Sequence, residues 1–97
     1  TFVKKVYEVE YVELKSLRER DIIDVLNFVG YVVNTNEPLT SLQRNDLIKE
    51  IQEQGYILIN TLEGVEKLYP TEILIRGVEN EYYPVKRTNF DKVYEVI

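Results

Sequence analysis

The stretch that decides the fold is GYILINTLEGVEKLYPTEILIRGVENEYYPVKRTNFDKVYEVI, which runs from Gly55 to Ile97. Gly, Pro and Asn residues lie at regular intervals in it, between short runs of β-branched and aromatic residues. Such spacing is typical of strands joined by tight turns. The stretch therefore predicts a β-meander with strands at residues 56–62, 65–69, 72–76 and 81–86, closed by a C-terminal turn at residues 89–93.

Six positions of this stretch are predicted to have structural roles: Gly64, Gly77, Asn80, Pro84, Phe90 and Tyr94. Gly64 is expected at a positive φ in a turn, and Asn80 is expected at a left-handed position, which Asn tolerates better than most residues. Pro84 is expected at a strand end, because proline cannot donate a hydrogen bond to a neighbouring strand. Phe90 and Tyr94 are expected to reach back from the C-terminal turn and close the core.

The N-terminal segment predicts a long strand at residues 2–14, because its side chains alternate in character. One alternating set contains Val9 and Tyr11, and the other contains Val12 and Leu14. The set with Val9 and Tyr11 is the more apolar, so we expect that set to face the core. Charges on the other set then predict a solvated face.

Two helices are predicted in the middle of the chain. The first spans residues 17–29, where a capping box of Ser16 and Glu19 would begin it and Gly30 would end it. The second spans residues 40–54, with a narrow apolar stripe and an otherwise charged surface.

Composition favours β structure as well. The chain of 97 residues contains 13 Val, 9 Ile and 8 Tyr but no Ala, and β-branched and aromatic residues are common in strands. Its length suits one domain, residues 1–97. With a short apolar run at residues 31–33, the predicted fold class is α+β: a single, mainly antiparallel sheet of five or six short strands with two helices on one face.

The residue types that are missing restrict the chemistry. The chain has no Cys and no His, which removes the usual thiolate nucleophile, the usual general base and the commonest metal ligand. We therefore expect no enzyme, no metal and no cofactor. The net charge of −5 argues against broad nucleic-acid binding, which needs an excess of Lys and Arg. No apolar run is long enough for a membrane span, so we expect a cytoplasmic protein.

Several short motifs follow one another in order along the chain: Lys4-Lys5 near the start of the first predicted strand, Phe28-Val29-Gly30, Thr61-Leu62-Glu63-Gly64, Glu81-Tyr82-Tyr83-Pro84, Phe90 and Tyr94-Glu95. In order and spacing they resemble a family of small uncharacterised proteins from tailed phages and prophages. The resemblance covers about three quarters of the chain and implies a bacterial host cell and a fold, but no enzymatic activity.

This chain departs from the family pattern at three places. Where the family has Pro-Gly-Asp, this sequence has Pro70-Thr71-Glu72, and where the family has a turn glycine, it has Asn80. A frequent family cysteine is replaced by Val85. The two missing glycines imply slightly different turns.

One candidate binding site is predicted at Tyr82, Tyr83, Lys86 and Arg87. Aromatic planes beside cations could stack a base or hold a phosphate. The alternative is that one tyrosine packs inward and the basic pair is an ordinary solvated loop. Carboxylates are numerous, but nothing in the sequence places two of them in one pocket, so no catalytic residue is predicted.

A second candidate is a sheet face. The runs around Leu58 and Leu74 contain apolar residues of both parities, so these strands are either covered on both faces or expose one face that marks an interface.

The leading functional hypothesis is a non-enzymatic phage or prophage accessory protein that binds a host or phage macromolecule, with inhibition of a host defence as one such role. Its acidic surface would suit a basic groove on a partner protein. The alternatives are a module that binds a small ligand or nucleotide, and a minor structural phage component that associates with itself, for instance as a homodimer.

Overall fold

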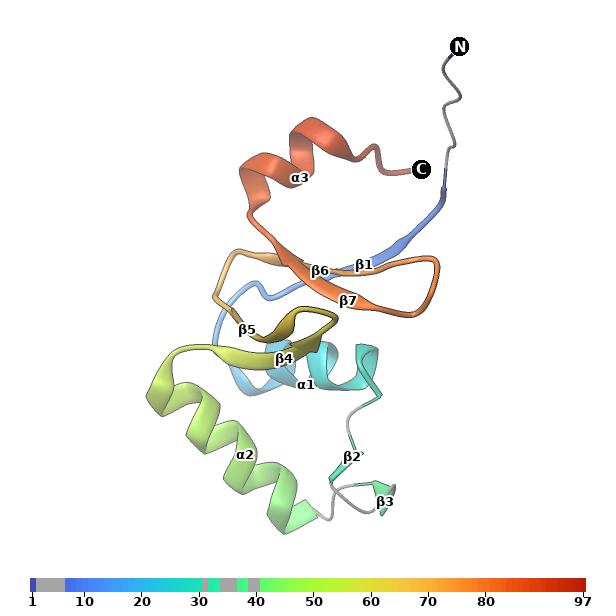
Figure 1. Cartoon of the computed structure of the whole chain (residues 1–97). Helices are drawn as coiled ribbons and strands as arrows, with labels where there is room; N and C mark the ends of the chain where they lie inside the picture. The colour runs from blue at the N-terminus through green and yellow to red at the C-terminus, as the bar shows by residue number, and fades with distance from the viewer. Residues whose placement is uncertain (2–6, 31, 34–36, 39–40) are drawn as a thin grey trace.

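The computed structural model describes residues 1, 7–30, 32–33, 37–38 and 41–97. In chain order it contains β1 (Glu10–Glu13), α1 (Glu19–Phe28), β2 (Val32–Val33), β3 (Glu37–Pro38), α2 (Ser41–Gln54), β4 (Ile57–Thr61), β5 (Gly64–Leu68), β6 (Ile73–Arg76), β7 (Tyr82–Val85) and α3 (Arg87–Val93). The α+β class is therefore confirmed, and Figure 1 shows the arrangement of the elements.

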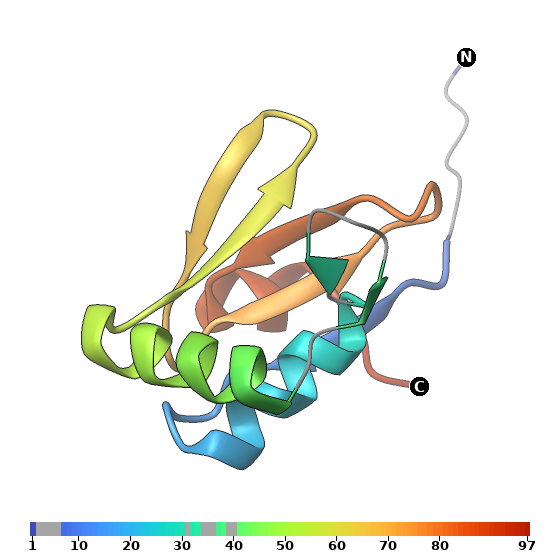
Figure 2. The same ribbon diagram turned by 90° about the horizontal axis from the view of Figure 1, so that it is seen from below.

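The prediction of a single sheet of five or six strands is wrong. The strands form three separate antiparallel sheets: β1-β6-β7, the β4–β5 hairpin, and the short pair β2–β3. Strand β4 lies close to β7, but the two are not joined in one hydrogen-bonded ladder. The four meander strands thus form as predicted. The β4–β5 hairpin, however, turns away from the β6–β7 hairpin instead of extending the sheet to which β6 and β7 belong (Figures 1 and 2).

The three-stranded sheet is covered on both faces. One face contributes Leu74 to the larger apolar cluster, together with residues of α1, α2 and the β4–β5 hairpin. The other face contributes Ile73 and Ile75 to a smaller cluster that α3 closes with Phe90. Both longer helices therefore lie on the same side of this sheet, and α3 lies on the opposite side (Figure 1).

The first strand is shorter than predicted, and the structure covers both of its faces. Strand β1 occupies only Glu10–Glu13; residues 2–6 of the predicted strand lie outside the described residues. Leu14 is fully buried in the larger cluster and Val12 packs against it, whereas Tyr11 lies over Phe90 on the α3 side. The predicted set with Val9 and Tyr11 does face a core, the smaller cluster. The predicted solvated face is wrong, because Val12 and Leu14 belong to the larger cluster on the other side.

Helix α1 begins without the predicted capping box. Its N-cap is Arg18, which makes no side-chain cap, and the Ser16 hydroxyl donates to Asp21 Oδ2 while accepting from the Arg18 amide. Ser16, two residues before the N-cap, therefore connects the segment before the helix to its first turn through these two hydrogen bonds. The end is as predicted, because Gly30 has φ +59° just after the helix.

Turn chemistry follows the sequence closely. Gly64 has φ +119° and Asn80 has φ +61°, as predicted. Thr71 also has a positive φ, +75°, in the turn where the Glu72 amide donates to the Tyr69 carbonyl. The two positions without glycine thus keep the backbone conformation that glycine favours.

Gly77 and Pro84 shape the β6–β7 hairpin. The Gly77 amide donates to the Glu81 carbonyl, and a side chain at Gly77 would collide with the Glu81 carboxylate. Pro84 lies within β7, opposite Leu74, and not at a strand end. The position tolerates proline because β7 is an edge strand of its sheet.

Candidate functional site

The two candidate strand runs differ in coverage. Ile73, Leu74 and Ile75 are all buried, so β6 is covered on both faces. In β4, Ile57 and Ile59 are buried but Leu58 between them is 50% exposed. Of the two possibilities left open by the sequence, β6 is covered on both faces, and the β4–β5 hairpin exposes one face.

The exposed face of the hairpin is called the outer face. Its strand residues are Leu58, Asn60, Val65 and Lys67, with Tyr56 and Tyr69 at the base of the hairpin and Leu62 at its tip. Leu58 lies opposite Lys67 in the β4–β5 pair, and cross-strand neighbours share a face. Val65 is 62% exposed, and Leu62 at the tip is 81% exposed. Three aliphatic side chains are therefore presented to solvent on a hairpin that projects from the body (Figure 2).

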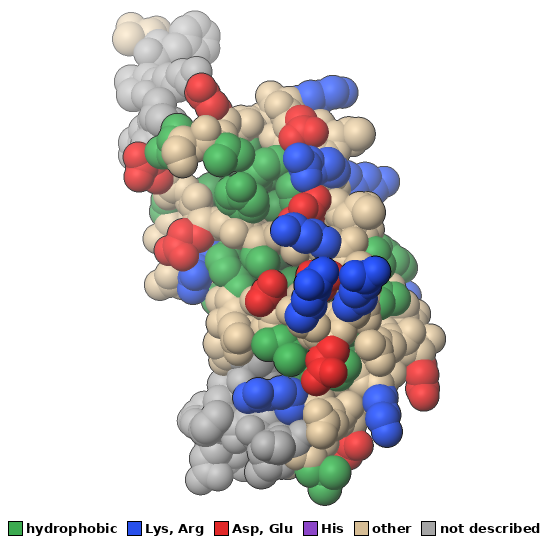
Figure 3. Space-filling view, turned by 180° about the vertical axis from the view of Figure 1, so that it is seen from behind, with side chains coloured by type: hydrophobic (Ala, Val, Ile, Leu, Met, Phe, Trp, Pro, Cys, Tyr) green, Lys and Arg blue, Asp and Glu red, His purple; other side chains and the backbone are tan. Residues whose placement is uncertain are grey.

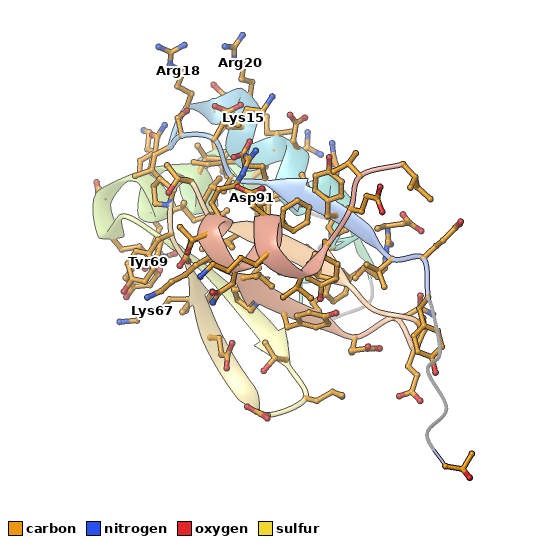
Figure 4. All side chains as sticks on the ribbon, turned by 90° about the horizontal axis from the view of Figure 1, so that it is seen from above. Lys15, Arg18, Arg20, Lys67, Tyr69 and Asp91 are labelled. Atoms are coloured by element: carbon orange, nitrogen blue, oxygen red, sulfur yellow. The ribbon has the colours of Figure 1, made fainter. Side chains whose placement is uncertain are left out.

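Aromatic rings extend the outer face at the base of the hairpin. Tyr56 and Tyr69 meet edge to face with ring centroids 5.6 Å apart, and Lys67 Nζ lies 4.6 Å from the Tyr56 ring centroid. Lys67 and Tyr69 are labelled beside each other in Figure 4. Apolar side chains with tyrosines beside them have the composition of the centre of a protein–protein interface, and a lysine such as Lys67 suits its polar rim.

The four residues of the predicted aromatic and basic site do not share one surface. Tyr82 and Tyr83 are neighbours in β7, so their side chains leave opposite faces of the sheet. Tyr82 packs against the larger cluster, and Tyr83 packs against the smaller one. Both rings are partly buried, so the pair forms no common stacking platform.

Tyr83 is held by a partner on the α3 side. Its hydroxyl lies 3.1 Å from the Tyr94 hydroxyl, and the Tyr94 ring stacks on Phe90 with centroids 5.3 Å apart. Burial, followed by the hydrogen bond with Tyr94, raises the pKa of Tyr83 well above its ordinary value. Tyr83 and Tyr94 together therefore fasten the chain end after α3 to the sheet.

The two basic residues have different surroundings. Arg87 Nη1 donates to Glu13 Oε1 at 2.7 Å, and its Nε approaches Asp91 at 3.3 Å. The hydrogen bond to Glu13 is the main reason why the pKa of Arg87 is raised. Lys86 is exposed at the N-cap of α3. A ligand phosphate at Arg87 would have to compete with two carboxylates.

The cation that does lie against the Tyr82 ring is Arg76, a residue outside the predicted site. Its Cζ is 4.5 Å from the Phe28 ring centroid and 5.9 Å from that of Tyr82. Its Nη2 donates to Glu10 Oε2 at 2.7 Å. Register alone could have indicated this contact, because Arg76 and Tyr82 face each other across the β6–β7 pair.

A hollow of about 530 Å³ lies where β1 leads into α1, and Lys15, Ser16, Arg18, Arg20, Asp21 and Asp24 line it. Arg18 and Arg20 point away from the ribbon in Figure 4. In the described part of the chain, the only basic residues in ion pairs are Arg76 and Arg87. Lys15, Arg18 and Arg20 therefore have no carboxylate partner in that part of the chain. Lys and Arg side chains are frequent on the face that Figure 3 shows, with Asp and Glu between them.

The described residues contain no group of three or more acidic side chains that could hold a metal ion. Within the same residues, no helix has the length and apolar character needed to cross a membrane. No protein-family model, curated protein or solved structure matches the chain.

Proposed function

We propose that the chain is a non-enzymatic accessory protein of a tailed phage or prophage, which binds a protein of its bacterial host or of the phage through the outer face of the β4–β5 hairpin. The observation that carries this proposal is the exposure of Leu58 and Val65 on one face of a projecting hairpin, with exposed Leu62 at its tip. The order of the sequence motifs supports the phage source, and inhibition of a host defence protein is one role that such binding would serve.

Covering exposed apolar side chains with a partner protein is a source of binding free energy. Apolar surface contributes roughly 25 cal/mol for each Å² removed from water, so a partner that covers these three side chains gains binding free energy. Ile57 and Ile59 on the opposite face already contribute to the core of this chain. The outer face adds nothing comparable to the fold, so its apolar residues suit an intermolecular contact.

Co-purification from host lysate tests the proposal, with the wild-type chain, Leu58→Glu and Val93→Glu as baits. Val93 is 73% exposed on α3, so its variant makes the same chemical change away from the hairpin. We expect a reproducible partner that binds wild type and Val93→Glu but is lost from Leu58→Glu. A partner that all three baits retain equally, or no partner at all, would count against the outer face. Thermal melts of both variants check that the fold is unchanged.

A second candidate function is the binding of a small anionic ligand or nucleotide, favoured by the hollow with Lys15, Arg18 and Arg20. Its position differs from the site predicted at Tyr82, Tyr83, Lys86 and Arg87. A thermal-shift screen with a nucleotide panel separates the two, because Arg18→Ala removes a shift that arises at the hollow and leaves one that arises at Lys86. No shift with any nucleotide would contradict this second candidate.

A further inference from the structure

Strand β5 forms the free edge of the β4–β5 hairpin. Among the described residues its only ladder partner is β4, and Figure 2 shows β5 on the side of the hairpin away from β7. Residues 64–67 are four consecutive exposed positions, so both faces of the strand meet solvent. Every second residue of β5 therefore directs its backbone N–H and C=O away from β4, where another strand can pair with them.

The charges along β5 determine how the strand would pair with a second copy of itself. In an antiparallel pair around a two-fold axis, the central residue lies opposite its own equivalent. Besides Gly64 at the end of the strand, which has no side chain, three exposed residues could take that place. A centre at Glu66 or at Lys67 sets like charges directly opposite each other, which is destabilising. A centre at Val65 sets two apolar side chains opposite each other instead.

The register centred on Val65 also makes opposite charges meet. It sets Glu63, in the turn before β5, opposite the partner's Lys67, and the two-fold axis repeats this pair. Glu63 and Lys67 are both exposed, so neither must leave the core to form the pair. Charged residues on edge strands usually prevent pairing between copies. Here the spacing of four residues between Glu63 and Lys67 favours pairing of two β5 strands in the register centred on Val65.

We propose that two copies of the chain pair antiparallel through β5, centred on Val65, to form a four-stranded sheet in the order β4, β5, partner β5, partner β4. A two-fold axis perpendicular to the sheet sets the outer faces of both hairpins on the same side. The inference deepens the proposed function because it doubles the apolar surface available to a partner. It is tested on the purified chain alone, so it fails or succeeds separately from binding of a host protein.

Disulfide cross-linking tests the register, because the chain contains no cysteine of its own. Val65→Cys places two thiols at the two-fold axis, within the Cα separation of roughly 4.4–6.8 Å that a disulfide needs. Leu58→Cys is the matched control: it is also exposed on the outer face, but in the dimer it lies three strand spacings across and four residues along from its equivalent, roughly 20 Å away. We expect Val65→Cys to form the covalent dimer at least roughly tenfold faster under mild oxidation. Equal rates for the two variants would overturn the register.

A charge exchange tests the same contact without a covalent bond. Because the ladder is short, we expect wild type to dimerise by sedimentation with a Kd on the order of 100 μM. Lys67→Glu creates two like-charge pairs and should weaken the dimer roughly tenfold, and the double variant Glu63→Lys/Lys67→Glu should restore it to within about threefold. Lys49→Glu on α2 is the control for net charge and should leave the Kd unchanged. A wild-type chain that stays monomeric at about 1 mM, or a dimer insensitive to Lys67→Glu, overturns the proposal.

Discussion

Strands β4 and β6 begin with almost the same sequence but have different surroundings. Residues 57–60 read Ile-Leu-Ile-Asn, and residues 73–76 read Ile-Leu-Ile-Arg. Both strands belong to antiparallel hairpins. Leu74 is fully buried, whereas Leu58 is 50% exposed.

The difference lies in the neighbours and not in the strand. The β6–β7 hairpin lies between α3 on one face and the larger apolar cluster on the other, so both parities of its sequence are core. The β4–β5 hairpin has that cluster on one face only. A tripeptide of three large aliphatic residues therefore marks a doubly covered strand in one case and a candidate interface in the other.

The largest loss of stability is expected when the side chain through which α3 covers β6 is removed. Phe90 is the buried residue of α3 and contacts Tyr11 and Tyr94 through its ring. We expect Phe90→Ala to lower the free energy of unfolding by about 3–5 kcal/mol, measured by urea unfolding. Val93→Ala, in the same helix but exposed, should have little effect. An unchanged stability for Phe90→Ala would show that α3 does not close the second face.

The next prediction compares the same substitution at the two equivalent leucines, Leu74 in β6 and Leu58 in β4. Leu74→Ala removes a fully buried side chain and should cost about 2–5 kcal/mol. Leu58→Ala makes the same change on the outer face and should cost about 0.5 kcal/mol or less, because exposed positions tolerate substitution. Both are measured by urea unfolding at a concentration where the chain is monomeric. Similar losses at the two positions would show that the hairpins are covered alike.

A smaller effect concerns the turn that joins the two hairpins. Thr71 is a β-branched residue at φ +75°, a conformation that favours glycine. We expect Thr71→Gly to raise the free energy of unfolding by about 0.5–1 kcal/mol, since relief of backbone strain exceeds the added chain entropy. Thr71→Ala keeps a Cβ at the same φ and is the control. A gain of the same size with alanine would mean that strain is not the cause.

An effect of comparable size depends on alkaline pH. The pKa of Tyr83 is raised by burial in the folded chain, so the stability linked to its proton is fully present below the ordinary tyrosine pKa of about 10 and is lost as pH rises above it. Tyr83→Phe should cost about 0.5–1.5 kcal/mol at about pH 8, where the hydrogen bond with Tyr94 is lost. It should also lose less stability than wild type between about pH 8 and about pH 11. Tyr7→Phe, at an exposed tyrosine, should follow wild type throughout.

Local elements could be predicted from the sequence because their causes are local. The observed meander strands lie within one or two residues of their predicted positions, and Gly30, Gly64 and Asn80 have the positive φ values that their turns require. The division into separate sheets could not be predicted, because it depends on how β4 meets β7 across the chain. The solvated face predicted for the first strand was wrong for a similar reason: Val12 and Leu14 are covered by helices and strands that are distant in the sequence.

The candidate site was only partly accessible from the sequence. Side chains alternate between the two faces of a strand, so the adjacent positions of Tyr82 and Tyr83 in the sequence already indicate that the two rings separate. The partners of Arg87 and Arg76 come from β1, more than sixty residues away in the chain. The exposure of Leu58 was one of two possibilities that the sequence left open, and only the arrangement of the hairpins distinguishes them.

The attachment of α3 has a consequence for local unfolding. Phe90 is the one buried residue among the seven of this helix, while β6 is buried along its apolar length. The amide protons of α3 can therefore exchange with solvent deuterium when the helix alone detaches, without opening of the larger cluster. Those of β6 exchange only when the sheet itself comes apart. The C-terminal segment is thus a separate, less protected unit of a chain whose two clusters lie on opposite faces of one three-stranded sheet.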